Sequence, residues 1–266
     1  MTALTLILFG VFGLAVGSFV NVVIVRVPSK ESLLQPPSKC PLCQTPIRGT
    51  DNIPVLSWLL LRGKCRACQE PIPVGYPLVE ATNMVLWVVA GARFHRVGEA
   101  VAYAIFFSVL LALSVIDLEL SILPDAITLP AAVVSIAVIA GLAFGYDGHT
   151  AGSHLVHALI GGFGYAGFLF ATLLAFEIVA HKEGMGFGDV KLALVLGMWL
   201  GYLTPYAVPV LVLYSLIAAS ILGLVVGLAY FLVRRKSMPF PFGPWLALGA
   251  VAVILAANPI LHRVAG

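Results

Sequence analysis

The stretch YAVPVLVLYSLIAASILGLVVGLAYFLV, residues 206–233, decides the class of fold because it carries no charged residue. A membrane-spanning helix needs about 20 mostly apolar residues, and this run is longer than that. The whole 266-residue chain has the same character, with 61% hydrophobic and 10% charged residues. Soluble domains average roughly 25% charged residues. Too few polar groups remain to cover a water-facing surface, so the sequence predicts an all-α, polytopic membrane protein.

Similar apolar runs recur along the chain and predict about eight transmembrane helices, at 2–25, 77–94, 100–118, 125–145, 154–180, 189–204, 206–233 and 243–261. Of the 15 Lys and Arg residues, only Arg93, Arg96 and Arg263 fall on the side opposite the long loop 26–76. The positive-inside rule therefore predicts that this loop is cytoplasmic and that both termini lie outside. The net charge of +3 is too small to indicate a nucleic-acid partner.

Glycines spaced four residues apart occur inside three of these runs, at Gly13/Gly17, Gly197/Gly201 and Gly223/Gly227. This spacing allows two helix backbones to approach closely. We expect the glycines to pack helices within one chain rather than to join two chains.

The loop 26–76 contains every cysteine of the chain, arranged as two CxxC pairs: Cys40, Cys43, Cys65 and Cys68. Two such pairs are typical of a tetrahedral zinc site with four thiolate ligands. Structural disulfides are rare on a reducing cytoplasmic face. The loop has little core of its own, so bound zinc is expected to supply most of its folding free energy.

Carboxylates at the ends of the predicted spans are candidate functional groups, because charge is costly in a bilayer. Asp117 ends the third span and Asp125 starts the fourth, directly after Pro124. Asp189 follows Gly186 and Gly188, which leave room for a substrate backbone. At both helix starts, stabilisation of the helix dipole is an alternative role for the acid.

Asp117 and Asp189 are expected at the same membrane depth on different helices. Two close carboxylates share one proton, and such a pair can activate water against a peptide bond. Composition and spacing alone leave two interpretations open, an aspartic protease and a proton relay in a transporter.

Several motifs in order resemble the bacterial type IV prepilin peptidases, the bifunctional leader peptidase/N-methyltransferases. They are Gly17-Ser-Phe-Val-Asn21-Val-Val-Ile-Val-Arg26, the four cysteines, Asn52-Ile-Pro-Val-Leu-Ser-Trp58, Tyr76-Pro-Leu-Val-Glu80, Ile116-Asp117 through Leu123-Pro-Asp125, Gly186-Phe-Gly-Asp189-Val-Lys191 and Pro241-Phe-Gly-Pro244. The resemblance implies a catalytic pair of Asp117 and Asp189 in the bacterial inner membrane. It also implies prepilin or pseudopilin substrates that are cleaved after a glycine, followed by methylation of the new N-terminus from S-adenosylmethionine.

The resemblance further suggests supporting roles near the acidic pair for Gly186, Gly188, Lys191, Asp125, Gly243 and Pro244. Lys191 is expected either to tune Asp189 or to anchor the helix near lipid headgroups. Candidate contacts to S-adenosylmethionine are Arg26, Asn52 and Glu80, with helix capping and snorkelling as the alternative for each. The expected division is a first helix at 1–25, a zinc domain at 26–76 and a seven-helix aspartic peptidase domain at 77–266. A peptidase without methyltransferase activity, using the zinc loop to dock substrate, remains an alternative.

Overall fold

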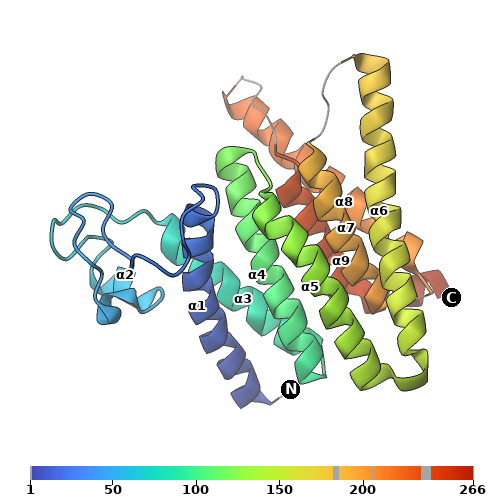
Figure 1. Cartoon of the computed structure of the whole chain (residues 1–266), viewed down its shortest axis with the longest axis horizontal. Helices are drawn as coiled ribbons and strands as arrows, with labels where there is room; N and C mark the ends of the chain where they lie inside the picture. The colour runs from blue at the N-terminus through green and yellow to red at the C-terminus, as the bar shows by residue number, and fades with distance from the viewer. Residues whose placement is uncertain (1, 182–185, 205, 235–240, 266) are drawn as a thin grey trace. The chain divides into compact units, whose positions relative to one another are not determined.

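The computed structural model describes residues 2–181, 186–204, 206–234 and 241–265. Within these ranges every named element is a helix (Figure 1), which confirms the predicted all-α class. The helices are α1 (Ala3–Arg26), α2 (Leu56–Leu60), α3 (Gly75–Arg93), α4 (Val97–Leu120), α5 (Asp125–Leu142), α6 (Ala151–Ala180), α7 (Phe187–Leu203), α8 (Val208–Arg234) and α9 (Gly243–Ala265). Each of the eight predicted spans coincides with one of the long helices.

Four segments among the described residues are long and apolar enough to cross a membrane: Ala3–Arg26, Val97–Leu120, Asp125–Ala180 and Val208–Val233. The third of these contains both α5 and α6. The predicted spans at 77–94, 189–204 and 243–261 coincide with α3, α7 and α9, which are helical but outside this set. Multiple spans are therefore established, and the count of eight stays a prediction.

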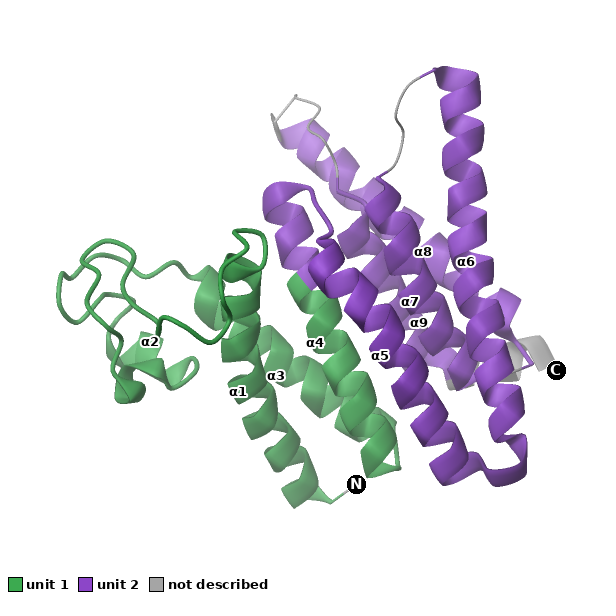
Figure 2. Cartoon of the chain, in the orientation of Figure 1, with its two compact units in different colours: residues 1–112 green, residues 113–266 purple. Residues whose placement is uncertain are grey.

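The chain forms two compact units, residues 1–112 and 113–266, and the division falls inside α4 (Figure 2). In the first unit α1 packs closely on α3. A Cβ atom at Gly13 would lie 2.8 Å from Trp87 Cβ, and one at Gly17 would lie 2.8 Å from the Cα of Glu80. Asn83 adds a buried hydrogen bond from its Nδ2 to the carbonyl oxygen of Gly13, at 2.7 Å. The predicted packing of Gly13 and Gly17 within the chain is confirmed.

In the second unit α6 and α7 make the corresponding close contact. A Cβ atom at Gly161 or at Gly197 would overlap the backbone carbonyl of the other glycine, and one at Gly201 would overlap that of His157. The predicted role of Gly197 and Gly201 in packing is therefore also confirmed. This contact fixes α7, and α7 carries Asp189 in its first turn.

Candidate functional site

Asp117 lies at the end of α4 and is buried, with 5% of its surface exposed. Its Oδ2 accepts a hydrogen bond from the backbone N–H of Gly243, the first residue of α9, at 3.2 Å. A helix N-terminus presents unpaired N–H groups and partial positive charge. The contact therefore orients the Asp117 carboxylate. The resemblance implies a supporting role for Gly243 near the acidic pair. The structure places its N–H against Asp117, and the functional role stays a prediction.

Asp189 lies in the first turn of α7 and is 7% exposed. Its carboxylate is close enough to Asp117 for the two charges to interact. The second unit therefore brings together two buried acids that are separated in the sequence. Neighbouring carboxylates of like charge disfavour double ionisation of the pair.

Gly188 and Gly243 flank the two acids and both are tightly packed. A Cβ atom at Gly243 would lie 2.7 Å from Asp117 Oδ2, and one at Gly188 would lie 2.9 Å from Leu123 Cβ. Gly186 is less constrained, since the nearest atom to its Cβ position, Asp189 Oδ2, is 3.8 Å away. Any side chain larger than hydrogen at Gly188 or Gly243 would therefore displace a neighbour at the site.

Lys191 pairs with Asp125 rather than with Asp189. Its Nζ donates to Asp125 Oδ1 at 2.5 Å and lies 5.2 Å from the centroid of the Phe187 ring. The pair joins the first turn of α5 to the N-terminal part of α7. Asp125 thus has an ion-pair partner in addition to its favourable position at a helix start. Pro244, the second residue of α9, follows directly after the Gly243 contact.

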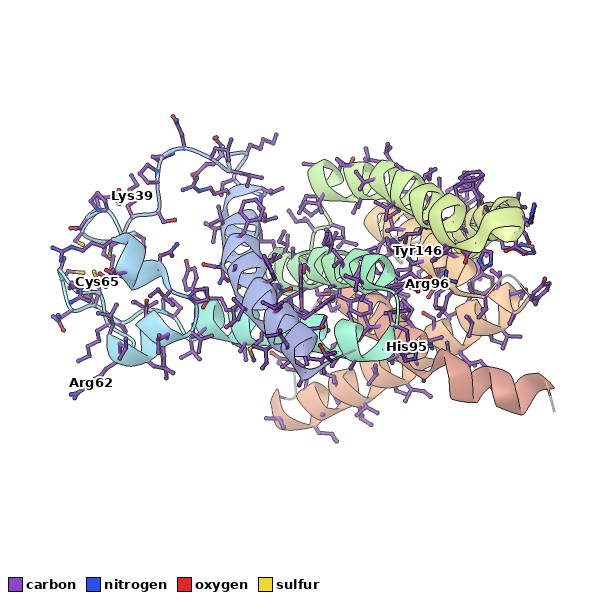
Figure 3. The ribbon with its side chains drawn as sticks, turned by 90° about the horizontal axis from the view of Figure 1, so that it is seen from below. Lys39, Arg62, Cys65, His95, Arg96 and Tyr146 are labelled. Carbon is purple, nitrogen blue, oxygen red and sulfur yellow. The ribbon has the colours of Figure 1, made fainter. Side chains whose placement is uncertain are left out.

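The four cysteine sulfurs of the loop 26–76 lie within 4.8 Å of one another, and none of the four cysteines is disulfide-bonded. Cys40 Sγ and Cys68 Sγ, from different CxxC pairs, are 3.8 Å apart. Figure 3 labels Lys39, Arg62 and Cys65 on this loop, with sulfur atoms gathered beside Cys65. Four thiols converging from two pairs are a donor set that suits a tetrahedral Zn²⁺ ion.

The two CxxC turns have the same backbone geometry. The N–H of Cys40 donates to the carbonyl of Thr45 at 3.0 Å, and that of Cys65 donates to the carbonyl of Glu70 at 2.8 Å. Gln44 and Gln69, which follow the second cysteine of each pair, have φ of 58° and 60°. The sequence carries this repeat as CPLCQTPI (40–47) and CRACQEPI (65–72). The zinc prediction rests on the cysteine spacing alone, whereas the repeat extends to the Gln and Pro-Ile positions that shape both turns.

Local hydrogen bonds already favour thiolates in the cluster. Those with the side chain and backbone of Thr45 lower the pKa of Cys43 to about 6. At Cys68 the backbone hydrogen bond with Glu70 acts in the same direction, but burial and the neighbouring cysteines outweigh it and raise the pKa to about 12. The neighbouring cysteines thus make ionisation of Cys68 unfavourable. A divalent cation would relieve that repulsion and release the proton, as metal binding by cysteine does.

The first unit contains a cavity of about 950 Å³ between the end of α1, the start of α3 and the cysteine loop. All three residues predicted to contact S-adenosylmethionine line it, namely Arg26, Asn52 and Glu80. The guanidinium of Arg26 donates to the carbonyls of Ser32 and Pro36, at 2.8 and 2.7 Å. It therefore also fixes the first part of the loop.

Glu80 holds a strained turn in the cavity wall, a role that no sequence pattern indicates. Its Oε2 accepts the backbone N–H of Val55 at 2.7 Å. Val55 has φ 61° and ψ −50°, a conformation that is costly for a β-branched residue. Across the turn the N–H of Leu56 donates to the carbonyl of Pro54 at 2.5 Å. The contact with Glu80 on α3 stabilises this conformation of Val55.

Two family profiles match the chain: the Bacterial Peptidase A24 N-terminal domain over residues 11–94 and the Type IV leader peptidase family over residues 104–228. No solved structure gives a significant match.

The chain is also similar over most of its length to proteins named prepilin leader peptidase/N-methyltransferase. Identity is 36% with that of Aeromonas hydrophila (94% of this chain, 90% of the relative) and 39% with that of Pectobacterium carotovorum subsp. carotovorum (91% and 90%). It is 35% with that of Neisseria gonorrhoeae (96% and 92%). The resemblance inferred from the motifs is confirmed, and the chain belongs to the type IV leader peptidase family.

Proposed function

We propose that the chain removes the leader peptide of type IV prepilins or pseudopilins and methylates the new N-terminal residue. The observation that carries the first activity is the pair of buried acids, Asp117 and Asp189, presented by separate helices within electrostatic reach of each other. The names of the relatives carry the substrate class, prepilins, and the second activity.

The proposed hydrolysis uses the shared proton of the acidic pair. The ionised carboxylate takes a proton from a water molecule, whose oxygen bonds to the carbonyl carbon of the scissile peptide. The protonated carboxyl donates its proton to the carbonyl oxygen. Collapse of this tetrahedral species breaks the C–N bond. The leaving amine takes a proton from the carboxyl that was protonated by water, and one hydroxyl group of the species returns its proton to the other carboxylate, so the pair again holds one proton. The Gly243 N–H keeps Asp117 oriented throughout.

The test of the peptidase uses purified protein in detergent with a synthetic prepilin. We expect Asp117→Asn and Asp189→Asn each to abolish leader removal while the helical circular dichroism is unchanged. Glu119→Gln serves as the control, because Glu119 is exposed and lies two residues from Asp117. Full cleavage by either aspartate variant would end the proposal.

For methyl transfer, the cavity of the first unit is the proposed site of S-adenosylmethionine, which supplies the methyl group when bound. A volume of about 950 Å³ falls within the range of about 300–1,000 Å³ usual for small-molecule sites. The Glu80 carboxylate suits a cationic ligand, and Asn52 offers both a donor and an acceptor. The cysteine loop, held by zinc, forms the opposite wall.

The two activities are separable by experiment. We expect tritium from methyl-labelled S-adenosylmethionine to appear on the mature N-terminus, and Asn52→Ala to reduce this transfer without slowing cleavage. Leader removal with no methyl transfer by the unaltered protein would favour the alternative, a peptidase whose cysteine loop docks substrate.

We further propose eight spans in the bacterial inner membrane, with the cysteine loop and the acidic pair on the cytoplasmic side and both termini outside. The proposal rests on the distribution of Lys and Arg. It keeps the division into 1–25, 26–76 and 77–266. The test uses a reporter that is active only on the side of the inner membrane opposite the cytoplasm. Fused after Gly266 it is expected to be active, and inserted at Gly49 it is expected to be silent.

A further inference from the structure

The side chain of Leu123 lies against both glycines that flank the acidic pair. A Cβ atom at Gly188 would lie 2.9, 3.4 and 3.6 Å from the Cβ, Cδ1 and Cγ atoms of Leu123. One at Gly243 would lie 3.3 and 3.4 Å from its Cδ1 and Cδ2. Leu123 therefore occupies the space beside Asp117 and Asp189 from a third segment, the connection between α4 and α5.

The position of Leu123 is fixed on both sides along the chain. On one side the N–H of Ser121 donates to the carbonyl of Asp117 at 2.8 Å. On the other side Pro124 caps α5, and the next residue, Asp125, is paired with Lys191 on α7. These contacts hold the backbone on both sides of Leu123 and keep its side chain beside the two glycines.

We propose that Leu123 is a specificity-determining residue that limits the size of the substrate residue at the scissile bond. The proposal rests on the proposed function, because it needs Asp117 and Asp189 to be the reacting acids. A peptide carbonyl must come within about 3–3.5 Å of the attacking water, which brings the adjoining substrate residue beside Leu123. A residue without a Cβ atom fits there, and each added carbon competes with the isobutyl group for space.

The size limit explains why two segments at the site, the starts of α7 and α9, present glycine while the connection between α4 and α5 presents leucine. Gly186, Gly188 and Gly243 leave room for the substrate backbone, and the Leu123 side chain limits the space for the substrate side chain. One methylene group more or less in an apolar pocket changes kcat/KM by about 10–200-fold. Shortening Leu123 should therefore produce a change in selectivity that is large enough to measure.

The experiment compares synthetic prepilins that carry Gly or Ala on the amino side of the scissile bond. For the unaltered protein we expect kcat/KM to be higher for the Gly peptide. In Leu123→Ala the ratio of Gly to Ala peptide should fall at least ~10-fold, through a gain on the Ala peptide. Leu123→Val should shift the ratio in the same direction by less. Ile122→Ala, which alters the exposed neighbour, should leave the ratio unchanged.

An equal loss on both peptides, or an unchanged ratio in both Leu123 variants, would overturn the proposal and give Leu123 a packing role only. This failure is distinct from failure of the proposed function, since the latter appears as cleavage by Asp117→Asn. Size-exclusion elution and helical circular dichroism in detergent identify any variant that has not folded, and the Val variant then decides the outcome.

Discussion

The backbone N–H of Gly243 donates to Oδ2 of Asp117 across 3.2 Å, linking the first residue of α9 to the last turn of α4. The two residues are far apart in the chain but adjacent in the second unit. A glycine is needed because a methyl group at this position would lie 2.7 Å from the same oxygen. Gly243 thus provides both the hydrogen bond to Asp117 and the space that the Asp117 carboxylate needs.

Gly243→Ala should lower the kcat of prepilin cleavage while the protein stays folded. The added Cβ pushes Asp117 out of place, and a displacement of about 1 Å can cost ~100-fold in rate. Steady-state cleavage in detergent measures the effect. Gly164→Ala is the matched control, because nothing lies within 4 Å of the Cβ position at Gly164. Equal activity of the two variants would show that the Gly243 contact is dispensable.

The ion pair between Lys191 and Asp125 should show coupling in a charge swap. Asp125→Lys and Lys191→Asp each place like charges at the junction of α5 and α7, while the double variant restores an opposite pair. The Lys191 and Asp125 side chains are 24% and 58% exposed, so solvent screening limits the coupling to about 1 kcal/mol or less. A double-mutant cycle on thermal unfolding in detergent measures it, with Lys191→Arg as the variant that keeps the charge. Additive effects of the two single changes would contradict a direct pairing.

Zinc should be present at about one ion per chain, and its removal should unfold only the cysteine loop. Cys65→Ser takes away one of four converging ligands, so we expect loss of zinc by atomic absorption and rapid proteolysis within residues 26–76. Helical circular dichroism should change little because α2 is short. A metal-free loop that resists protease would refute a structural zinc site.

Acid should release the metal before it disturbs the helices. Ligation requires thiolates, so protons compete with zinc and affinity falls as the pH falls. The pKa of Cys43, lowered to about 6 by its hydrogen bonds with Thr45, lets this ligand stay ionised at neutral pH. Thr45→Val removes the side-chain hydrogen bond and should shift zinc release to higher pH. Equilibrium dialysis over a pH series from neutral to acid follows the shift, and coincident curves would exclude a role for Thr45.

Gly197→Ala should destabilise the second unit because its Cβ would overlap the backbone of Gly161 on α6. Overpacking of this kind typically costs about 1–3 kcal/mol. Thermal unfolding in detergent should show a lower midpoint for Gly197→Ala than for the control Gly141→Ala, whose Cβ position has open space. A midpoint equal to that of the control would contradict the prediction, because it would mean that the added methyl group does not reduce the stability of the contact between α6 and α7.

The sequence by itself determined the helical class, the positions of the long helices and the metal-binding character of the cysteine loop. These features are local: apolar runs of sufficient length form helices in lipid because every backbone group must be hydrogen-bonded. The spacing of the two CxxC pairs is local in the same sense, because it indicates four thiolate ligands for one metal ion. The assignment of Asp117 and Asp189 as a catalytic pair rests on motif resemblance, since residue types alone left a proton relay open.

Only the tertiary structure decided which side chains meet. It paired Lys191 with Asp125 instead of Asp189, placed Leu123 against Gly188 and Gly243, and held Val55 in a strained turn through Glu80. The reason is physical: these contacts join segments from different helices, and their geometry depends on how closely the backbones approach. That approach is set by helix packing around small residues. The spacing of glycines in the sequence indicates that a helix packs closely, but it does not show which helix is the partner.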